Sequence, residues 1–388
     1  MVSTADKIQV VHIITGLPTG GAEMMLYKLL CQIDRDKFDS YVISLTSVGI
    51  VGPKIQALGI PVFSIRMRNG LPDPIGFFRL VSQLKKLQPD IVQTWLYHAD
   101  FLGGLAAKLM GVKKVIWNIR HSNLDAEVNK WHTRMTARLC GLFSGWLADA
   151  IICNSERAAQ VHQALGYKKS LFHQIGNGFD LAGFYPDVTA KPALCKQFDI
   201  PEQSFLVGLI ARFDPQKDHQ NFIQAVSRVL ARFMDVRFIM VGAGVDGHNK
   251  QLQEWIEATG HGDHFLLLGE RNDIPQINAA LDIACSSSVG ESFPNAIGEA
   301  MACSIPCVVT DVGDSAKLVA NTGIVVPSED PDALANAIID LLDKPEAYRQ
   351  NLGKQARQRI EKNFSLIAIV HEYEQLYEQL NIIPQAIN

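Results

Sequence analysis

Short apolar runs rich in β-branched residues alternate along the chain with longer segments whose apolar residues recur at helical spacing. The first run covers residues 7–15 and ends at Gly16, and helical spacing follows over residues 22–32. Further runs of this kind predict strands at residues 40–45, 61–65, 90–95, 114–119, 148–153, 171–175, 205–210, 236–241, 264–268, 283–286, 306–310 and 323–325. Helical stretches such as 74–87 and 99–110 lie between most of them. Continuous apolar strands that alternate with helices predict parallel sheets with helices on both faces.

This alternation occurs twice, and the Gly- and Pro-rich residues 176–200 interrupt it. A chain of 388 residues exceeds the length at which a single core stops growing, so two domains are expected. We predict an α/β protein with two doubly wound, Rossmann-like domains facing a deep cleft: residues 1–175 and 201–365, joined by a linker at 176–200. Residues 329–380 predict two or three helices and no further strand. Ligands of such sheets bind at the carboxyl ends of the strands.

The composition narrows the class of protein. No apolar run approaches the roughly 18 residues that cross a bilayer. The polar amino terminus opens directly into a strand, which argues against a signal peptide. Seven scattered cysteines without a C-x-x-C pair predict reduced, mostly buried thiols rather than a disulfide framework or a zinc site. We therefore expect a cytoplasmic protein.

The net charge of −4 hides an asymmetry between the two halves of the chain. Residues 1–175 carry 20 Lys and Arg against 12 Asp and Glu, a net +8, and the remainder carries −12. Either the first half meets an anionic partner or this is ordinary surface composition. Within it, residues 130–147 (KWHTRMTARLCGLFSGWL) combine basic and aromatic side chains: Trp131, Arg134, Arg138, Phe143 and Trp146. This segment either lies on an anionic membrane, at the inner face of the cell membrane, or is a core helix with a charged outer face.

Several common nucleotide and metal motifs are absent from the sequence. The dinucleotide fingerprint G-x-G-x-x-G does not follow the first strand, and there is no G-x-x-x-x-G-K-[ST] loop. NAD enzymes and phosphate-loop NTPases are therefore not indicated. Of the two Asp-x-Asp triplets, 34–36 and 330–332, the second is typical of a helix start, with Asp330 as the cap and Pro331 in the first turn. We predict no metal site, no cofactor and no nucleic-acid partner.

The most informative stretch covers residues 286–309, SSSVGESFPNAIGEAMACSIPCVV. A loop at 290–293 precedes Pro294, which suits a first helical position, and residues 295–303 form a helix rich in small side chains that allow close packing. The amino terminus of this helix predicts an anion site at Ser292, Phe293, Pro294 and Asn295. Glu291 and Glu299 would lie roughly 8–12 Å apart. That separation suits one carboxylate on a sugar and the other on a ribose, although each alone is also typical of a solvated acid.

The Glu-x7-Glu pair in this setting resembles the signature of the retaining glycosyltransferases of family 4 (glycosyl transferases group 1), which have the GT-B fold. Further segments resemble the family's motifs in the same order along the chain: the first loop at 15–23, I-G-N-G-F-D at 175–180, A-R-F with Lys217 at 211–217, and G-E-R-N-D-I at 269–274. Two departures stand in the third segment, where Ala211 and Asp218 occupy positions at which the family usually has glycine.

The resemblance implies catalytic roles for four residues: Glu291, His121, Arg212 and Lys217. Glu291 would anchor sugar hydroxyls, His121 would contact the transferred sugar, and Arg212 and Lys217 would hold the donor diphosphate and neutralise the charge of the leaving group. The implied donor contacts are Gly20, Gly21, Ser292, Phe293, Pro294, Asn295, Glu299, Arg271 and Asn272. Gly20 and Gly21 would let the backbone approach the diphosphate, Glu299 would bind the ribose, and Arg271 and Asn272 would lie by the base. His98 would face the cleft on the acceptor side.

The function implied is transfer, with retention, of a hexose or N-acetylhexosamine from a nucleoside diphosphate sugar, with UDP as the expected base. The acceptor is a glycan or a lipid-linked glycan in cell-surface polysaccharide biosynthesis, and neither metal nor cofactor is required. A nucleotide-sugar 2-epimerase or hydrolase on the same two-domain plan is the alternative. By the same resemblance, a carboxyl-terminal helix within residues 366–388 would cross back onto the first domain.

Overall fold

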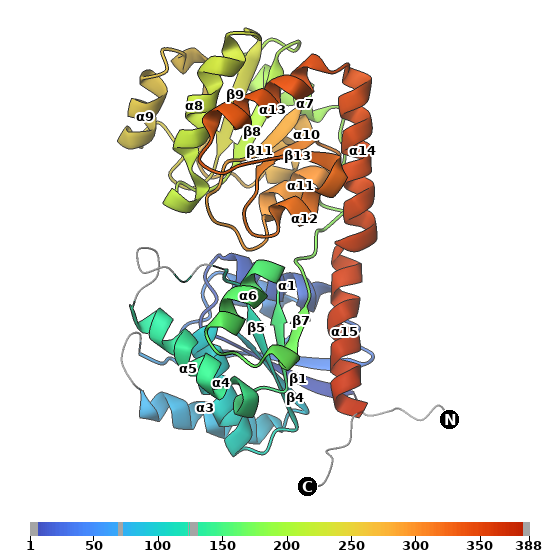
Figure 1. Cartoon of the computed structure of the whole chain (residues 1–388). Coiled ribbons are helices and arrows are strands. Elements are labelled where there is room, and N and C mark those ends of the chain that lie inside the picture. Colours follow the sequence, from blue (N-terminus) through green and yellow to red (C-terminus); the bar gives the residue numbers. More distant parts are fainter. Residues whose placement is uncertain (1–6, 69–72, 123, 125–130, 383–388) are drawn as a thin grey trace, which may run out of the picture. The chain divides into compact units, whose positions relative to one another are not determined.

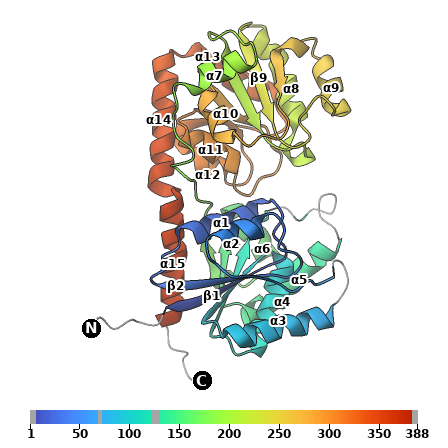
Figure 2. The same ribbon diagram turned by 180° about the vertical axis from the view of Figure 1, so that it is seen from behind.

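The computed structural model describes residues 7–68, 73–122, 124 and 131–382. The chain forms two compact units, each with its own core. Unit 1 comprises residues 1–178 together with 366–388, and unit 2 comprises residues 179–365. Figures 1 and 2 show each unit from two opposite sides.

Unit 1 is built on a seven-stranded sheet in which every neighbouring pair of strands is parallel. The strands are β1 (Ile8–Ile14), β2 (Phe38–Ser44), β3 (Val62–Ser64), β4 (Ile91–Trp95), β5 (Lys114–Ile119), β6 (Ala150–Cys153) and β7 (Phe172–Gln174). Their order across the sheet is β3-β2-β1-β4-β5-β6-β7. The order reverses between β1 and β4, which is the topological switch point of a doubly wound sheet.

Helices cover both faces of this sheet because its strands are apolar on both sides. They are α1 (Gly21–Gln32), α2 (Val51–Ala57), α3 (Pro74–Leu87), α4 (Tyr97–Leu109), α5 (Trp131–Leu147), α6 (Glu156–Ala164) and α15 (Leu366–Ile382), with a short 3-10 turn, η1 (Lys169–Leu171). The buried side chains of α1, α2 and α15 share one core cluster, and those of α3, α4 and α5 share the cluster on the opposite face. The last helix of the chain therefore completes the core of unit 1 (Figure 1).

Unit 2 repeats this plan with six parallel strands in the order β10-β9-β8-β11-β12-β13. They are β8 (Phe205–Ile210), β9 (Val236–Val241), β10 (Phe265–Leu267), β11 (Ile283–Ser286), β12 (Cys307–Thr310) and β13 (Gly323–Val326). The helices are α7 (Ala190–Gln197), α8 (His219–Leu230), α9 (Lys250–Glu257), α10 (Ile274–Ala280), α11 (Asn295–Ala302), α12 (Ser315–Val319), α13 (Pro331–Asp343) and α14 (Glu346–Asn363), with 3-10 turns η2 (Pro215–Lys217), η3 (Gly262–His264) and η4 (Ala320–Thr322). The switch point lies between β8 and β11.

The structure confirms the two doubly wound sheets and every predicted strand to within two residues at each end. In the described part of the chain three helices follow the last strand, and Asp330 caps the first of them by accepting a hydrogen bond from the Ala333 amide. The helix expected at residues 99–110 begins two residues earlier, at Tyr97, because Leu96 takes a left-handed conformation (φ 74°) that ends β4 abruptly. Part of the predicted linker, residues 176–200, belongs to unit 2, where α7 packs against α10.

The structure also bears on the cysteines and on membrane-spanning segments. All seven cysteines are free, and six of them are buried, as the sequence predicts. None of the helices in the described part of the chain is long and apolar enough to traverse a bilayer.

Candidate active site

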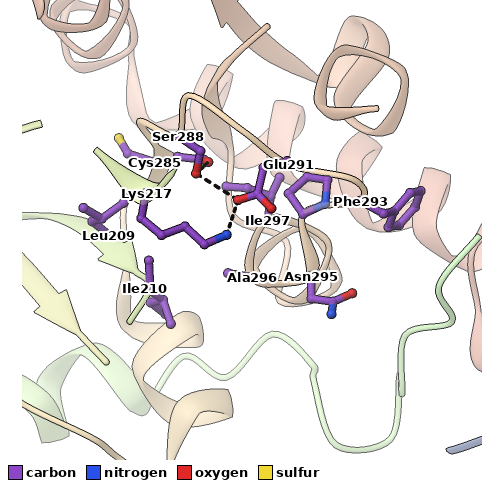
Figure 3. A pocket seen from close by; sticks show the side chains of 13 residues that line it. Leu209, Ile210, Lys217, Cys285, Ser288, Glu291, Phe293, Asn295, Ala296 and Ile297 are labelled. Carbon is purple, nitrogen blue, oxygen red and sulfur yellow. Dashed lines mark hydrogen bonds and ion pairs between the residues drawn. The ribbon is translucent and has the colours of Figure 1, made fainter. Parts of the chain in front are cut away.

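A pocket of about 140 Å³ opens at the switch point of unit 2. It is lined by residues from the end of β8, the turn η2, the end of β11 and the start of α11 (Figure 3). Five residues singled out from the sequence line it: Lys217, Glu291, Phe293, Pro294 and Asn295. Segments far apart in the sequence meet here because the carboxyl ends of β8 and β11 are adjacent in the sheet.

The central feature of the pocket is an ion pair between Lys217 and Glu291. The Lys217 ammonium donates to Oε1 of Glu291, and the Ser288 hydroxyl donates to the same oxygen at 2.8 Å. The side chains are 20% and 12% exposed, so both charges are largely withdrawn from solvent. A half-buried cation and carboxylate at a shared pocket wall can bind an anion and a set of hydroxyl groups side by side.

Hydrogen bonds to backbone carbonyls hold together the two loops that carry this pair. Ser287 Oγ donates to the Lys217 carbonyl at 2.9 Å, and the Val289 amide donates to the Gln216 carbonyl at 2.9 Å. Gly313 has φ 57°, and a Cβ placed there would lie 2.3 Å from the Glu291 carbonyl oxygen. Only glycine fits that position, because any side chain would displace the loop of Glu291.

Arg212, the second cation expected at the diphosphate, lies in a different environment from Lys217. Its side chain is 64% exposed and does not line the pocket. Its Nε and Nη2 donate to Oδ2 of Asp214 at 3.1 and 2.9 Å. Asp214 also accepts from the Gln216 amide at 3.0 Å and so caps the turn η2. The structure therefore places Lys217 at the pocket wall and Arg212 at the surface beside it.

The helix α11 begins at Asn295, where the sequence predicts it, and ends at Ala302, one residue before the predicted end. Pro294 is its N-cap residue, with ψ 97°, and not its first helical residue. The Phe293 ring is buried and packs against Phe179 and Phe364, so the backbone of Phe293 is what it offers to the pocket (Figure 3). A Cβ at Gly298 would lie 1.9 Å from the ring of Phe179, which confirms that the small residues of α11 serve close packing.

The other residues predicted in unit 2 lie outside this pocket. Ser292 and Glu299 are half-buried, before and on α11, and do not line it. Arg271 and Asn272 line a second depression together with Glu270, Asp273 and Gln276. There the Arg271 guanidinium is bidentate on the Asp273 carboxylate, at 2.8 and 2.6 Å, which lowers the pKa of that carboxyl. The structure thus separates these two from the Lys217–Glu291 pair.

In unit 1 the predicted histidines lie around the carboxyl ends of β4 and β5. The His121 ring stacks on Tyr97 at a centroid distance of 6.2 Å, and the neighbouring His98 ring lies 5.8 Å from that of His132 on α5. Burial, followed by the charge of His132, lowers the pKa of His98. His98 is therefore neutral at pH 7 and can either donate or accept a hydrogen bond.

A buried hydrogen-bond chain fixes Tyr97, the residue that supports His121. His162 Nδ1 lies 2.7 Å from the Ala158 carbonyl, which can only accept, so Nδ1 carries the proton and Nε2 is the acceptor. The Tyr97 hydroxyl therefore donates to His162 Nε2 at 2.8 Å. Burial lowers the pKa of His162 to about 4, so this acceptor is kept at neutral pH.

The predicted glycine loop of unit 1, which contains Gly20 and Gly21, follows β1, one of the two strands at the switch point of that sheet. Gly20 is the N-cap residue of α1 and has an extended conformation. A Cβ at Gly20 would lie 2.3 Å from a carboxylate oxygen of Glu23, whose side chain folds back over the loop. Burial raises the pKa of Glu23. Gly21 is the first residue of the helix.

Sequence reasoning missed several supporting residues: Ser288, Gly313, Tyr97 and His162. Ser288 and Gly313 act on Glu291 from positions 3 and 22 residues away, and only the second carried a signal, a glycine three residues after a predicted strand. Tyr97 carried a weak signal, because it follows the fourth strand. His162 lies on α6, 65 residues from Tyr97, and nothing in the sequence links the two.

We expect Tyr97→Phe to lower the free energy of unfolding of unit 1 by about 1–3 kcal/mol, because it leaves the buried Nε2 of His162 without a donor. Urea unfolding followed by tryptophan fluorescence would measure it. Tyr41→Phe is the matched control, because its hydroxyl meets Asp39 in a half-buried position. Equal effects of the two substitutions would contradict the assigned hydrogen-bond chain.

Among the described residues, no three His, Cys, Asp or Glu side chains come together as a possible metal site.

Comparison of this chain with known proteins identifies its family. The family model described as Glycosyl transferases group 1 matches residues 204–344, and the one described as Glycosyltransferase Family 4 matches residues 19–182. A protein of Escherichia coli, UDP-Gal:alpha-D-GlcNAc-diphosphoundecaprenol alpha-1,3-galactosyltransferase, is 25% identical over 97% of this chain and 98% of its own length. The lipopolysaccharide core biosynthesis mannosyltransferase LpsB of Rhizobium meliloti is 28% identical over 60% of this chain and 66% of its own. The crystal structure of HepE from Anabaena with UDP-glucose has the same fold, with a TM-score of 0.81 and 22% identity over 96% of this chain and all of that one.

Proposed function

Because the chain belongs to the group 1, family 4 glycosyltransferases, with their GT-B fold, and transfers sugar from a nucleotide sugar, we propose that it uses a UDP-hexose or UDP-N-acetylhexosamine and a lipid-linked acceptor. The E. coli relative is named for UDP-galactose and a diphosphoundecaprenol-linked GlcNAc, and it matches this chain over nearly its whole length. HepE was crystallised with UDP-glucose. These names support UDP as the base and a glycan on a lipid diphosphate as the acceptor in cell-surface polysaccharide biosynthesis.

The Lys217–Glu291 pair at the switch point of unit 2 is the observation that carries the mechanism. In the proposed reaction an acceptor hydroxyl attacks the anomeric carbon as the bond from that carbon to the β-phosphate oxygen breaks. The proton of the hydroxyl passes to the departing phosphate oxygen, on the same face of the sugar, so the configuration is retained. Lys217 stabilises the negative charge that grows on the leaving diphosphate. Glu291 accepts hydrogen bonds from the sugar hydroxyls, and the Ser288 hydroxyl orients it.

Several further residues are assigned to substrates in this proposal. Glu299 binds the ribose, and Arg271 and Asn272 lie by the base. In unit 1, His121 contacts the transferred sugar, held by its stack on Tyr97, and His98 serves the acceptor. The remaining donor contacts are proposed for Gly20, Gly21, Ser292, Phe293, Pro294, Asn295 and Arg212.

We also propose that the reaction needs no metal ion and that the protein works at the cytoplasmic face of the membrane. Lys217, and Arg212 once it leaves Asp214, supply the positive charge that a divalent cation would otherwise provide. Seven free cysteines are typical of a reducing compartment.

Release of nucleoside diphosphate from a panel of UDP, GDP and ADP sugars tests the donor assignment. We expect slow release of UDP from one donor, unchanged by EDTA and lost in Glu299→Ala. Glu257→Ala, an exposed acid on α9, is the matched control and should behave as wild type. Polyprenyl-diphosphate-linked GlcNAc should accelerate the release and yield a new glycosidic product. No release from any donor, with no thermal shift from any nucleotide, would rule the proposal out.

A further inference from the structure

We infer that the outward face of α5 in unit 1 is the surface by which this protein docks on an anionic lipid bilayer. The inference deepens the proposed function, because it rests on a lipid-linked acceptor and names the surface that would bring the enzyme to it. Figure 1 shows α5 at the edge of the helix layer that it forms with α4.

The outward face of α5 is mostly apolar, with Arg138 exposed among large apolar side chains, and this differs from the charged outer face of the core-helix alternative. A core helix would have a charged outer face, yet Trp131, Leu142 and Trp146 are 75%, 74% and 60% exposed. The exposed apolar side chains of the helix are Trp131, Met135, Leu139, Leu142, Phe143 and Trp146. Large exposed apolar side chains gathered on one helix mark an interaction surface.

The inward face of α5 fixes how the helix is turned. Ala137, Cys140, Ser144 and Leu147 are buried, and α5 packs along α4. Ser144 Oγ accepts a hydrogen bond from the Lys168 amide at 3.0 Å, which ties the end of the helix to the segment before β7. These contacts hold the apolar stripe toward solvent.

The charge of this surface favours an anionic partner. Residues 131–147 contain no Asp or Glu, and Arg138 is exposed in line with Trp131, Leu142 and Trp146. Arg134 stands one turn before Arg138. At the other end, the Lys168 side chain lies 3.3 Å from where a Cβ of Gly145 would be, beside Trp146. Basic residues next to an apolar helical face, with tryptophan at both ends, are typical of helices that lie in the interface of an anionic membrane.

The place of α5 in the unit connects this surface to the acceptor. His132, in its first turn, faces His98, the residue proposed to serve the acceptor, with ring centroids 5.8 Å apart. A helix of 17 residues is about 25 Å long, so the apolar stripe runs from the acceptor side of the sheet to the far end of the helix layer. A sugar carried on a membrane diphosphate would therefore be presented at the amino end of α5.

Sedimentation with lipid vesicles tests the inference without any sugar substrate. We expect the wild-type protein to sediment with vesicles of phosphatidylglycerol and phosphatidylcholine in equal parts. With vesicles of pure phosphatidylcholine, or at high salt, most of the protein should stay in the supernatant. The triple variant Trp131→Ser, Leu142→Ser, Trp146→Ser should bind the anionic vesicles at least about tenfold more weakly. Arg138→Glu should weaken binding by roughly tenfold at low salt. Met234→Ser, which changes a 63% exposed apolar residue of unit 2, should bind as wild type.

The same variants separate this inference from the proposed function. In the absence of lipid, UDP release by the triple variant and by Arg138→Glu should equal that of wild type, because none of these residues lies in the pocket. Wild-type protein that does not sediment with anionic vesicles, or a triple variant that binds as wild type does, would overturn the docking surface while leaving donor chemistry intact. Self-association that the triple variant abolishes, without vesicle binding, would assign the face to a second copy and also overturn it.

Discussion

Lys217→Ala is expected to lower the rate of sugar transfer by roughly a hundredfold while the protein remains folded. Lys217 is the cation that lines the pocket at the end of β8, and it is only 20% exposed, so its charge acts in a partly desolvated site. Without it, the charge on the leaving diphosphate loses its nearest compensating group. The substitution also removes the ammonium group that donates to Glu291, whose carboxylate still accepts from the Ser288 hydroxyl.

The measurement is the initial rate of UDP release with acceptor, alongside the melting temperature. Lys217→Arg, which keeps the charge, should recover part of the rate, and Lys196→Ala, an exposed lysine of α7 in the same unit, should have no effect. Full activity of Lys217→Ala would remove this residue from the mechanism.

The second large effect concerns pH and the stability of the fold. Burial lowers the pKa of His12 to about 3 and that of His162 and His219 to about 4 each, from an ordinary 6.5. Below pH 6.5 the unfolded chain binds protons at these histidines and the folded chain does not. Their contribution to stability is therefore complete above pH 6.5 and is lost as the pH falls toward 4. The loss is about 1.4 kcal/mol per pH unit for each histidine, or about 4 kcal/mol per unit for the three together.

Two buried acids of unit 1 oppose this trend. Burial raises the pKa of Asp100 and of Glu23, so the folded state holds their protons more tightly and gains stability as the pH falls. A comparison of wild type with His162→Gln isolates the contribution of this histidine: the variant should lose about 1.4 kcal/mol less stability per pH unit between pH 6.5 and 4.5. Urea unfolding at a series of pH values measures both slopes. Parallel slopes for the two proteins would show that His162 is already protonated in the folded state.

Most of the fold could be predicted because its signal is local. Most strands are short apolar runs, and the central ones, such as β4, β5 and β8, are largely buried on both faces. Periodicity places such runs without knowledge of their neighbours. Helix ends were less certain. The start of α4 at Tyr97 follows from the left-handed Leu96, and the position of Pro294 before α11, not within it, follows from its extended ψ. Both depend on backbone angles that residue type constrains only weakly.

Residues on loops after the switch-point strands were predicted as site candidates, and the structure brings Lys217 and Glu291 together from positions 74 residues apart. In the structure Arg212 lies on the surface in an ion pair with Asp214, and Arg271 binds Asp273 in a separate depression. Asp214 and Asp273 each stand two residues after the arginine that they bind. Whether such a pair forms depends on the loop backbone and the side-chain rotamers, which no pattern of residue types specifies.

By itself, the sequence determined the number, order and type of the elements, the two-sheet architecture and the loops that carry charged groups, because apolar periodicity and motif spacing are properties of contiguous residues. Only the tertiary structure decided which charges meet, how Ser288 and Gly313 hold Glu291, and how His162 fixes Tyr97 beneath His121. It also decided that α5 turns its tryptophans outward. These are contacts between residues distant in the chain, and they exist only after the strands have set the loops and helices side by side.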